Sequence, residues 1–155
     1  MAETNLNESK RRERIFRYAP LVLWIGVIFI MSSGQGSMKE TSYFIRPLLE
    51  FIFPGATEET LMIYHGYIRK FAHFAEYAAL VFWASRAFRS SSIAFLQKFW
   101  QFAAFILVLS IAAIDEYNQS FNSLRTSSIY DVLIDISGGL TMILLLVSYK
   151  FFSGR

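Results

Sequence analysis

Hydrophobic residues dominate four stretches of the chain, and polar or charged residues separate these stretches. They cover residues 15–31, 67–88, 95–114 and 136–152. Each is close to the roughly 20 residues that an α-helix needs to cross the hydrocarbon core of a bilayer. The pattern therefore predicts an all-α membrane protein, built as a four-transmembrane-helix bundle.

The first apolar stretch follows a basic tail over residues 1–14, which we expect to lie in the cytoplasm. A cleaved signal peptide is the alternative interpretation, because small residues follow the apolar run at positions 32–34. The length of the run and the lack of an Ala-x-Ala cleavage site favour a retained span. Residues 15–155 are then a single four-helix transmembrane domain.

The longest connection, residues 32–66, is interrupted by an apolar patch over residues 43–53. Its apolar side chains at helical spacing are Phe44, Leu48, Phe51 and Ile52. This spacing predicts an amphipathic helix that lies in the membrane interface, within the first outer loop. We expect Pro47 and Pro54 to limit its length, because proline stops a helix that reaches it from upstream.

The composition supports a membrane location, since 54% of the residues are hydrophobic and 17% are charged. The chain has no cysteine, which excludes disulfides, thiolate metal sites and a cysteine nucleophile. Basic residues gather in the tail, in residues 86–98 and in residues 150–155, and the positive-inside rule places all three on the cytoplasmic side of the inner membrane. Both termini are then cytoplasmic. The same rule explains the net charge of +3 without a nucleic-acid partner.

In this topology the polar residues that interrupt the spans meet at the outer face. At the start of the second span, Lys70, His73 and Tyr77 lie three or four residues apart and share one helix face, with Glu76 beside His73. We expect this face to meet the polar ends of the next two spans.

A second polar cluster runs from the end of the third span to the start of the fourth. Its members are Asp115, Glu116, Gln119, Arg125, Asp131 and Asp135. An ionised side chain at the bilayer centre costs roughly 2.5–3.5 kcal/mol, so charged groups at membrane depth are paired, face the protein interior and indicate a functional site.

These groups suit acid–base chemistry on an anionic substrate, because histidine transfers protons near neutral pH and Arg or Lys can bind a phosphate. The candidate catalytic residues are His73, Glu76, Asp115, Glu116, Asp131 and Asp135. The candidate substrate-binding residues are Lys70, Tyr77, Gln119 and Arg125. Carboxylates also bind hard divalent ions, so two interpretations of the site stay open. In one the site holds no metal, and in the other Asp115, Glu116 and Asp135 bind Mg²⁺ or another divalent cation.

The two clusters carry short motifs with specific spacing. These are Lys70-Phe71-Ala72-His73-Phe74-Ala75-Glu76-Tyr77, then Asp115-Glu116 with Gln119 and Phe121, then Arg125, Ser128 and Asp131, and more weakly Ser32-Ser33. The set resembles the successive motifs of the VanZ-like membrane proteins. Leu124 stands where that family usually has Gly, and Asp135, where it usually has Asn, adds an acid to the site, while Gly138 keeps its place.

The resemblance implies a small polytopic protein of the bacterial cell envelope, in a family associated with tolerance of glycopeptide antibiotics such as teicoplanin. It supplies no reaction. The residues themselves leave two functions open: a hydrolase or phosphatase acting on a phosphate-bearing lipid or lipid-linked cell-wall precursor, and a non-catalytic module that binds a lipid head group. The many carboxylates favour the enzyme, because a pure anion binder gains nothing from them. The apolar inner halves of the spans disfavour an ion or proton pathway.

Overall fold

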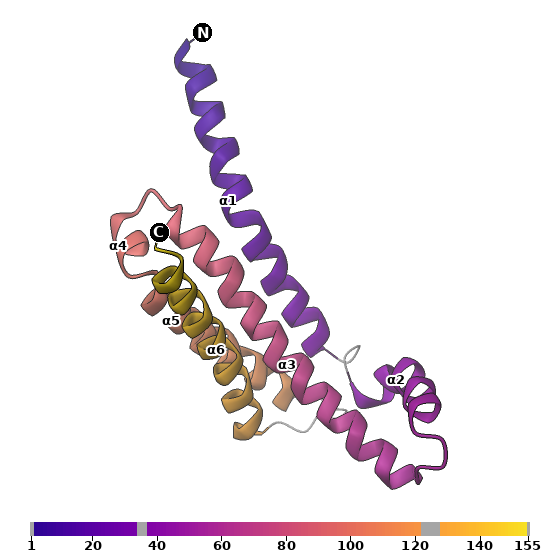
Figure 1. The fold of residues 1–155 in the computed structure, drawn as a ribbon. Helices are drawn as coiled ribbons and strands as arrows, with labels where there is room; N and C mark the ends of the chain where they lie inside the picture. The colour runs from indigo at the N-terminus through magenta and orange to yellow at the C-terminus, as the bar shows by residue number, and fades with distance from the viewer. Residues whose placement is uncertain (1, 34–36, 122–127, 155) are drawn as a thin grey trace.

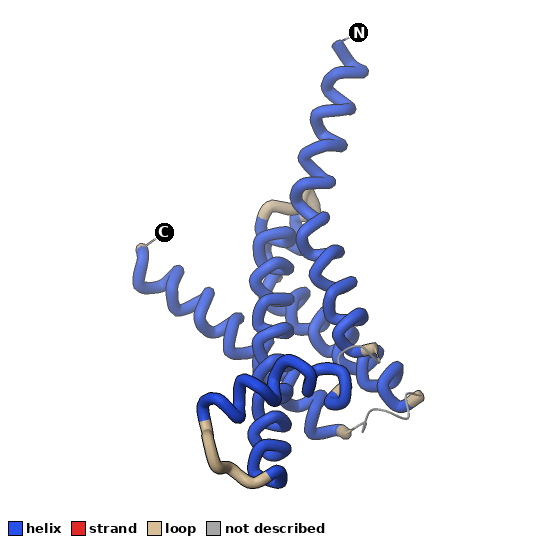
Figure 2. Tube along the Cα trace, turned by 90° about the vertical axis from the view of Figure 1, so that its right-hand side faces the viewer, coloured by secondary structure: helices blue, strands red, loops and turns tan. Residues whose placement is uncertain are grey.

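The computed structural model describes residues 2–33, 37–121 and 128–154, and almost all of them are helical. The helices are α1 (Ala2–Ser32), α2 (Met38–Ile52), α3 (Glu58–Arg89), α4 (Ala94–Lys98), α5 (Trp100–Ser120) and α6 (Ile129–Ser153). The described ranges contain no strand (Figure 2), so the predicted all-α class is confirmed.

Helix α3 is the centre of the molecule, because α1, α2, α4, α5 and α6 all pack against it. Figure 1 shows α1 on one side of α3 and the pair α5 and α6 on the other. The side chains of Tyr77, Leu80, Val81 and Ala84 in α3 are completely buried. They form the core with apolar side chains of α1 and α5.

Three helical segments of the described chain are long and apolar enough to cross a membrane: Glu8–Ser32, Trp100–Ser120 and Ile129–Ser153. Helix α3, which contains the predicted span 67–88, is not among them because charged residues interrupt it. Its neighbours shield it, so it needs less apolar surface than a helix that faces lipid on most sides. The crossing by α3 stays a prediction, and with it the count of four spans.

The ends of the helices differ from the expected ones in two places. Helix α1 continues backwards through the basic tail to Ala2. Helix α2 runs straight through Pro47, so the expectation that this proline limits the helix is wrong. Proline removes one backbone N–H donor, but Pro47 is exposed, so the carbonyl it leaves without a helical partner can meet water.

Helix α2 has the two-faced character that the sequence predicted. It packs on α3 through the buried Leu49 and exposes the predicted apolar residues Phe44, Leu48, Phe51 and Ile52. Two polar contacts tie it to α3: Thr41 Oγ1 lies 2.9 Å from His65 Nε2, and Arg46 Nη2 lies 2.5 Å from Glu58 Oε2. The helix is therefore anchored along one face only.

The two ends of the bundle differ in what they contain. The C-terminus and α4 lie at the same end of the bundle, and the N-terminal part of α1 extends in the same direction (Figure 1). Helix α2, the end of α5 and the start of α6 lie at the opposite end. The polar clusters of the sequence belong to this second end.

Candidate functional site

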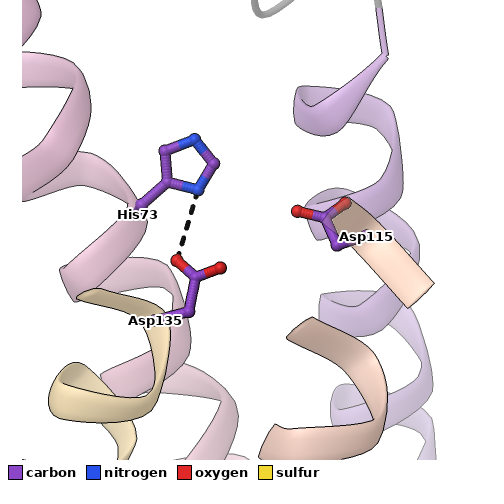
Figure 3. A group of neighbouring side chains, drawn as sticks. All are labelled: His73, Asp115 and Asp135. Carbon is purple, nitrogen blue, oxygen red and sulfur yellow. Dashed lines mark ion pairs between the residues drawn. The ribbon is translucent and has the colours of Figure 1, made fainter. Parts of the chain in front are cut away.

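Three helices bring together His73 of α3, Asp115 of α5 and Asp135 of α6. One nitrogen or oxygen atom of each side chain lies within 4.8 Å of the others, and Figure 3 shows the three side chains pointing toward one another. His73 Nδ1 lies 3.4 Å from Asp135 Oδ1, the distance of an ion pair. Both aspartates are only 1% exposed. The structure thus gathers three predicted catalytic residues that are up to 62 positions apart in the sequence, from 73 to 135.

A glycine sets how closely α6 approaches α3 beside this group. A Cβ atom on Gly138 would lie 2.1 Å from the backbone oxygen of Phe74. Phe74 follows His73 directly, and Gly138 is one helical turn after Asp135. The absence of a side chain at Gly138 therefore allows the approach that brings His73 and Asp135 into contact.

A carboxamide on the same helix orients Asp115. Gln119 Nε2 donates a hydrogen bond of 3.0 Å to Asp115 Oδ2, and both side chains are buried. The spacing of four residues places them on one face of α5, as the sequence indicated. Gln119, predicted to bind substrate, thus contacts a predicted catalytic carboxylate.

Tyr77 lies one turn after His73 on α3 and is fully buried. Its hydroxyl has no hydrogen-bond partner among the residues that the structure describes. An unsatisfied buried hydroxyl typically costs about 1–3 kcal/mol, and packing alone would be met by phenylalanine. The ring of Tyr77 is therefore part of the apolar core, and its hydroxyl belongs with the polar group.

The other candidates on α5 and α6 lie outside the three-residue group. The Glu116 carboxylate accepts a hydrogen bond from the backbone N–H of Ser128, the residue that caps the start of α6. Asp131 is half-buried in the first turn of α6. Arg125 falls within residues 122–127 and so lies outside the described residues.

The remaining candidates on α3 flank His73. Lys70 is exposed one turn before it, and Glu76 is half-buried three residues after it. The backbone carbonyl of Glu76 accepts a hydrogen bond of 2.9 Å from Trp24 Nε1, which joins α1 to α3 near the site.

The close packing at Gly138 was not predicted from the sequence. The Gly138-Gly139 pair in a largely apolar helix was the available signal, because small residues allow close contact between membrane helices. Gly139 also faces a crowded surface, since a Cβ there would lie 3.0 Å from a methyl group of Val108.

A comparison with known families identifies the family of the chain. The family model described as VanZ/LLP1 matches residues 18–152, a range that includes His73, Asp115, Asp135 and every other candidate residue. No curated protein and no solved structure matches the chain. The match covers most of the chain, and the protein therefore belongs to the VanZ/LLP1 family.

Proposed function

We propose that the protein is a membrane hydrolase whose acid–base site acts on a phosphate-bearing lipid or a lipid-linked cell-wall precursor. The observation that carries this proposal is the 3.4 Å contact between His73 and the buried Asp135, with Asp115 beside them. A histidine held by a carboxylate is a common arrangement for proton transfer near neutral pH. The residues of this site come from three separate helices, which also explains why the other helices pack around α3.

The contact assigns separate roles to the two nitrogens of the His73 ring. Nδ1 faces Asp135, so Nε2 is the atom that exchanges a proton with the reactants. In hydrolysis, Nε2 takes a proton from the water that attacks phosphorus. The bond from phosphorus to the lipid oxygen breaks, and the same proton passes to that oxygen. The enzyme ends the cycle in its starting protonation state.

The position of the site along the bundle supports an outward-facing orientation. The end that carries both termini also carries the exposed basic residues Arg86, Arg89 and Lys150, and the positive-inside rule places that end in the cytoplasm. The end with His73 then faces outward. Helix α3, the second predicted span along the chain, crosses the membrane in addition to the three apolar helices. Lys70 and Arg125 supply positive charge for the phosphate, with α2 resting in the outer interface.

Phosphate release tests the proposed function. The detergent-purified protein is given a panel of lipid monophosphates and pyrophosphates, and wild type is compared with His73→Gln. We expect the variant to lose at least about 100-fold in rate, the usual size of a general acid–base contribution. His65→Gln is the matched control because His65 is the other histidine of the chain, and its rate should equal that of wild type.

Two results would contradict the hydrolase. One is unchanged release by His73→Gln, which would mean that the reaction occurs elsewhere. The other is no release from any lipid, which would favour a module that binds a head group, and mass spectrometry of co-purified lipid would then identify the ligand class.

A further inference from the structure

We propose that His73, Asp115 and Asp135 together bind one divalent transition-metal ion, and that this ion is Zn²⁺. The inference rests on the proposed function but changes the role of His73 in it, because an imidazole that binds zinc through Nδ1 keeps its proton on Nε2 and cannot take a second one from water. A water bound to the zinc would then be the nucleophile, and bulk water would take its proton and supply the one that the lipid oxygen gains. Binding itself is measured without any reaction. The group offers one imidazole nitrogen and two carboxylate groups from three helices, all within 4.8 Å. The ligand set differs from the one that the sequence suggested, because His73 takes the place of Glu116.

The spacing of the donors fits a shared ion. Zinc binds nitrogen and oxygen ligands at about 2.0–2.2 Å, so two ligands of one tetrahedral ion lie about 3.4 Å apart. His73 Nδ1 and Asp135 Oδ1 have this separation, 3.4 Å. The other donor atoms of the group also lie within 4.8 Å of one another.

Two buried atoms point independently to a ligand. Within residues 37–121 and 128–154, Asp135 Oδ1 accepts no hydrogen bond, although the residue is 1% exposed, and the Tyr77 hydroxyl has no hydrogen-bond partner. Figure 3 shows the Asp135 carboxylate directed toward the His73 ring, with the Asp115 carboxylate facing the same space. Buried charges in proteins are paired with other charges or coordinate metals.

The donor types favour zinc over magnesium. Magnesium demands near-ideal octahedral geometry with oxygen ligands, whereas imidazole suits zinc. Three protein ligands also leave a position for water or for a phosphate oxygen, as in catalytic zinc sites. The hydrogen bond from Gln119 to Asp115 is the type of second interaction that holds a ligand in place.

The chain is well suited to a direct binding measurement. It has no cysteine and only two histidines, so few other groups compete for zinc. The protein should be purified without a polyhistidine tag and titrated with Zn²⁺ against a chromogenic chelator. We expect one equivalent per chain, and we expect His73→Gln, Asp115→Asn and Asp135→Asn each to weaken binding by more than about 100-fold. His65→Gln and Glu59→Gln, at residues outside the site, should bind as wild type does.

Two further measurements keep the test decisive. If a ligand variant does not fold, Gln119→Ala keeps all three ligands and should still weaken binding by roughly 10-fold or more. Co²⁺ in place of Zn²⁺ reports nitrogen and oxygen coordination by its visible absorption, which should disappear in His73→Gln.

The possible results separate the metal from the reaction. Absence of zinc binding by the wild type, preference for Mg²⁺ over Zn²⁺, or full binding by His73→Gln overturns the metal site. Phosphate release that persists after removal of metal by chelator also overturns it, while the proposed hydrolase stands. Zinc binding that needs all three residues, without any phosphate release, supports the metal site and contradicts the hydrolase.

Discussion

At the end of the bundle that carries both termini, the cations are exposed and lie over aromatic rings. The guanidinium of Arg86 is 5.7 Å from the ring centre of Trp83, and that of Arg89 is 5.7 Å from the ring centre of Trp100. At the opposite end, His73 and Asp135 form an ion pair inside the protein, and Asp115 lies within 4.8 Å of both. The same chain therefore places charge in water at one end and inside the protein at the other.

This difference predicts how each end responds to mutation. An exposed cation over an aromatic ring contributes roughly 0.5–1 kcal/mol, whereas breaking a buried ion pair costs about 3–5 kcal/mol. Substitutions of similar residue types should therefore differ several-fold in their effect on the free energy of unfolding, according to whether the residue is buried or exposed. Four changes, from the largest expected effect to the smallest, test whether burial determines the size of the effect on stability.

Gly138→Ala should have the largest effect. The new Cβ would lie 2.1 Å from the backbone oxygen of Phe74, and backbone atoms cannot move aside as a flexible side chain can. Overpacking typically costs about 1–3 kcal/mol, and this contact should exceed the upper value. The measurement is thermal unfolding in detergent.

Gly26→Ala is the matched control, because a Cβ at Gly26 meets no atom within 4 Å. Alanine is the better helix former by roughly 1 kcal/mol, so this variant should melt at the same or a higher temperature. Equal melting of the two variants would mean that α3 and α6 are not held in contact at Gly138.

Asp135→Asn should come second. It keeps the size of the side chain but removes the charge that faces His73, so we expect a loss of about 3 kcal/mol in unfolding free energy. The matched exposed change is Glu58→Gln, which removes a partner of Arg46 at the surface and should leave the melting temperature unchanged. If Glu58→Gln lowered the melting temperature more than Asp135→Asn does, the expected order of buried and exposed sites would be reversed.

Arg86→Gln should have a smaller effect. It removes the cation over Trp83 at the exposed end, and the expected loss is below about 1 kcal/mol. Thermal unfolding at low and high salt is the measurement. A loss as large as that of Asp135→Asn would show that exposure does not weaken this contact.

Acidification should have the smallest effect, through the contact between α2 and α3. Burial lowers the pKa of His65 below its ordinary value, and Arg69 adds to the shift. The unfolded chain therefore binds a proton at higher pH than the folded chain. The contribution of His65 to stability is present above about pH 6.5 and declines as the pH falls below it.

Melting temperatures at pH 8 and pH 5 measure this contribution. The wild type should lose more stability than His65→Gln on acidification, by less than about 1 kcal/mol, because one hydrogen bond to Thr41 is involved. An identical loss in both proteins would assign the pH dependence to other groups.

The helical class and the apolar segments could be predicted because length and hydropathy determine them locally. The structure confirms the helical class and three membrane-type helices, and α3 shows the limit of the method. Hydropathy measures how well a segment suits lipid, but α3 packs against five other helices. Its mixed composition reflects its neighbours, which a single segment does not reveal.

The sequence predicts which helix ends carry the candidate site residues, but it does not predict which face of each helix turns toward the other helices. Asp115 and Glu116 are neighbours in sequence, yet they point about 100° apart around α5, as the helix geometry requires. Asp115 turns to the three-residue group, and Glu116 reaches Ser128. Which of the two faces α3 depends on how α5 packs, and the sequence alone does not contain that rotation.

The central place of α3 also has a consequence for how the protein is made. Helix α3 leaves the ribosome before α5 and α6, and it is not among the segments that are apolar enough to enter a bilayer by composition alone. If α3 is the proposed additional span, its stable insertion should wait until α5 and α6 emerge and pack against it. Those same helices carry Asp115 and Asp135, so the newly synthesised chain would then complete its insertion and its polar site in a single late step.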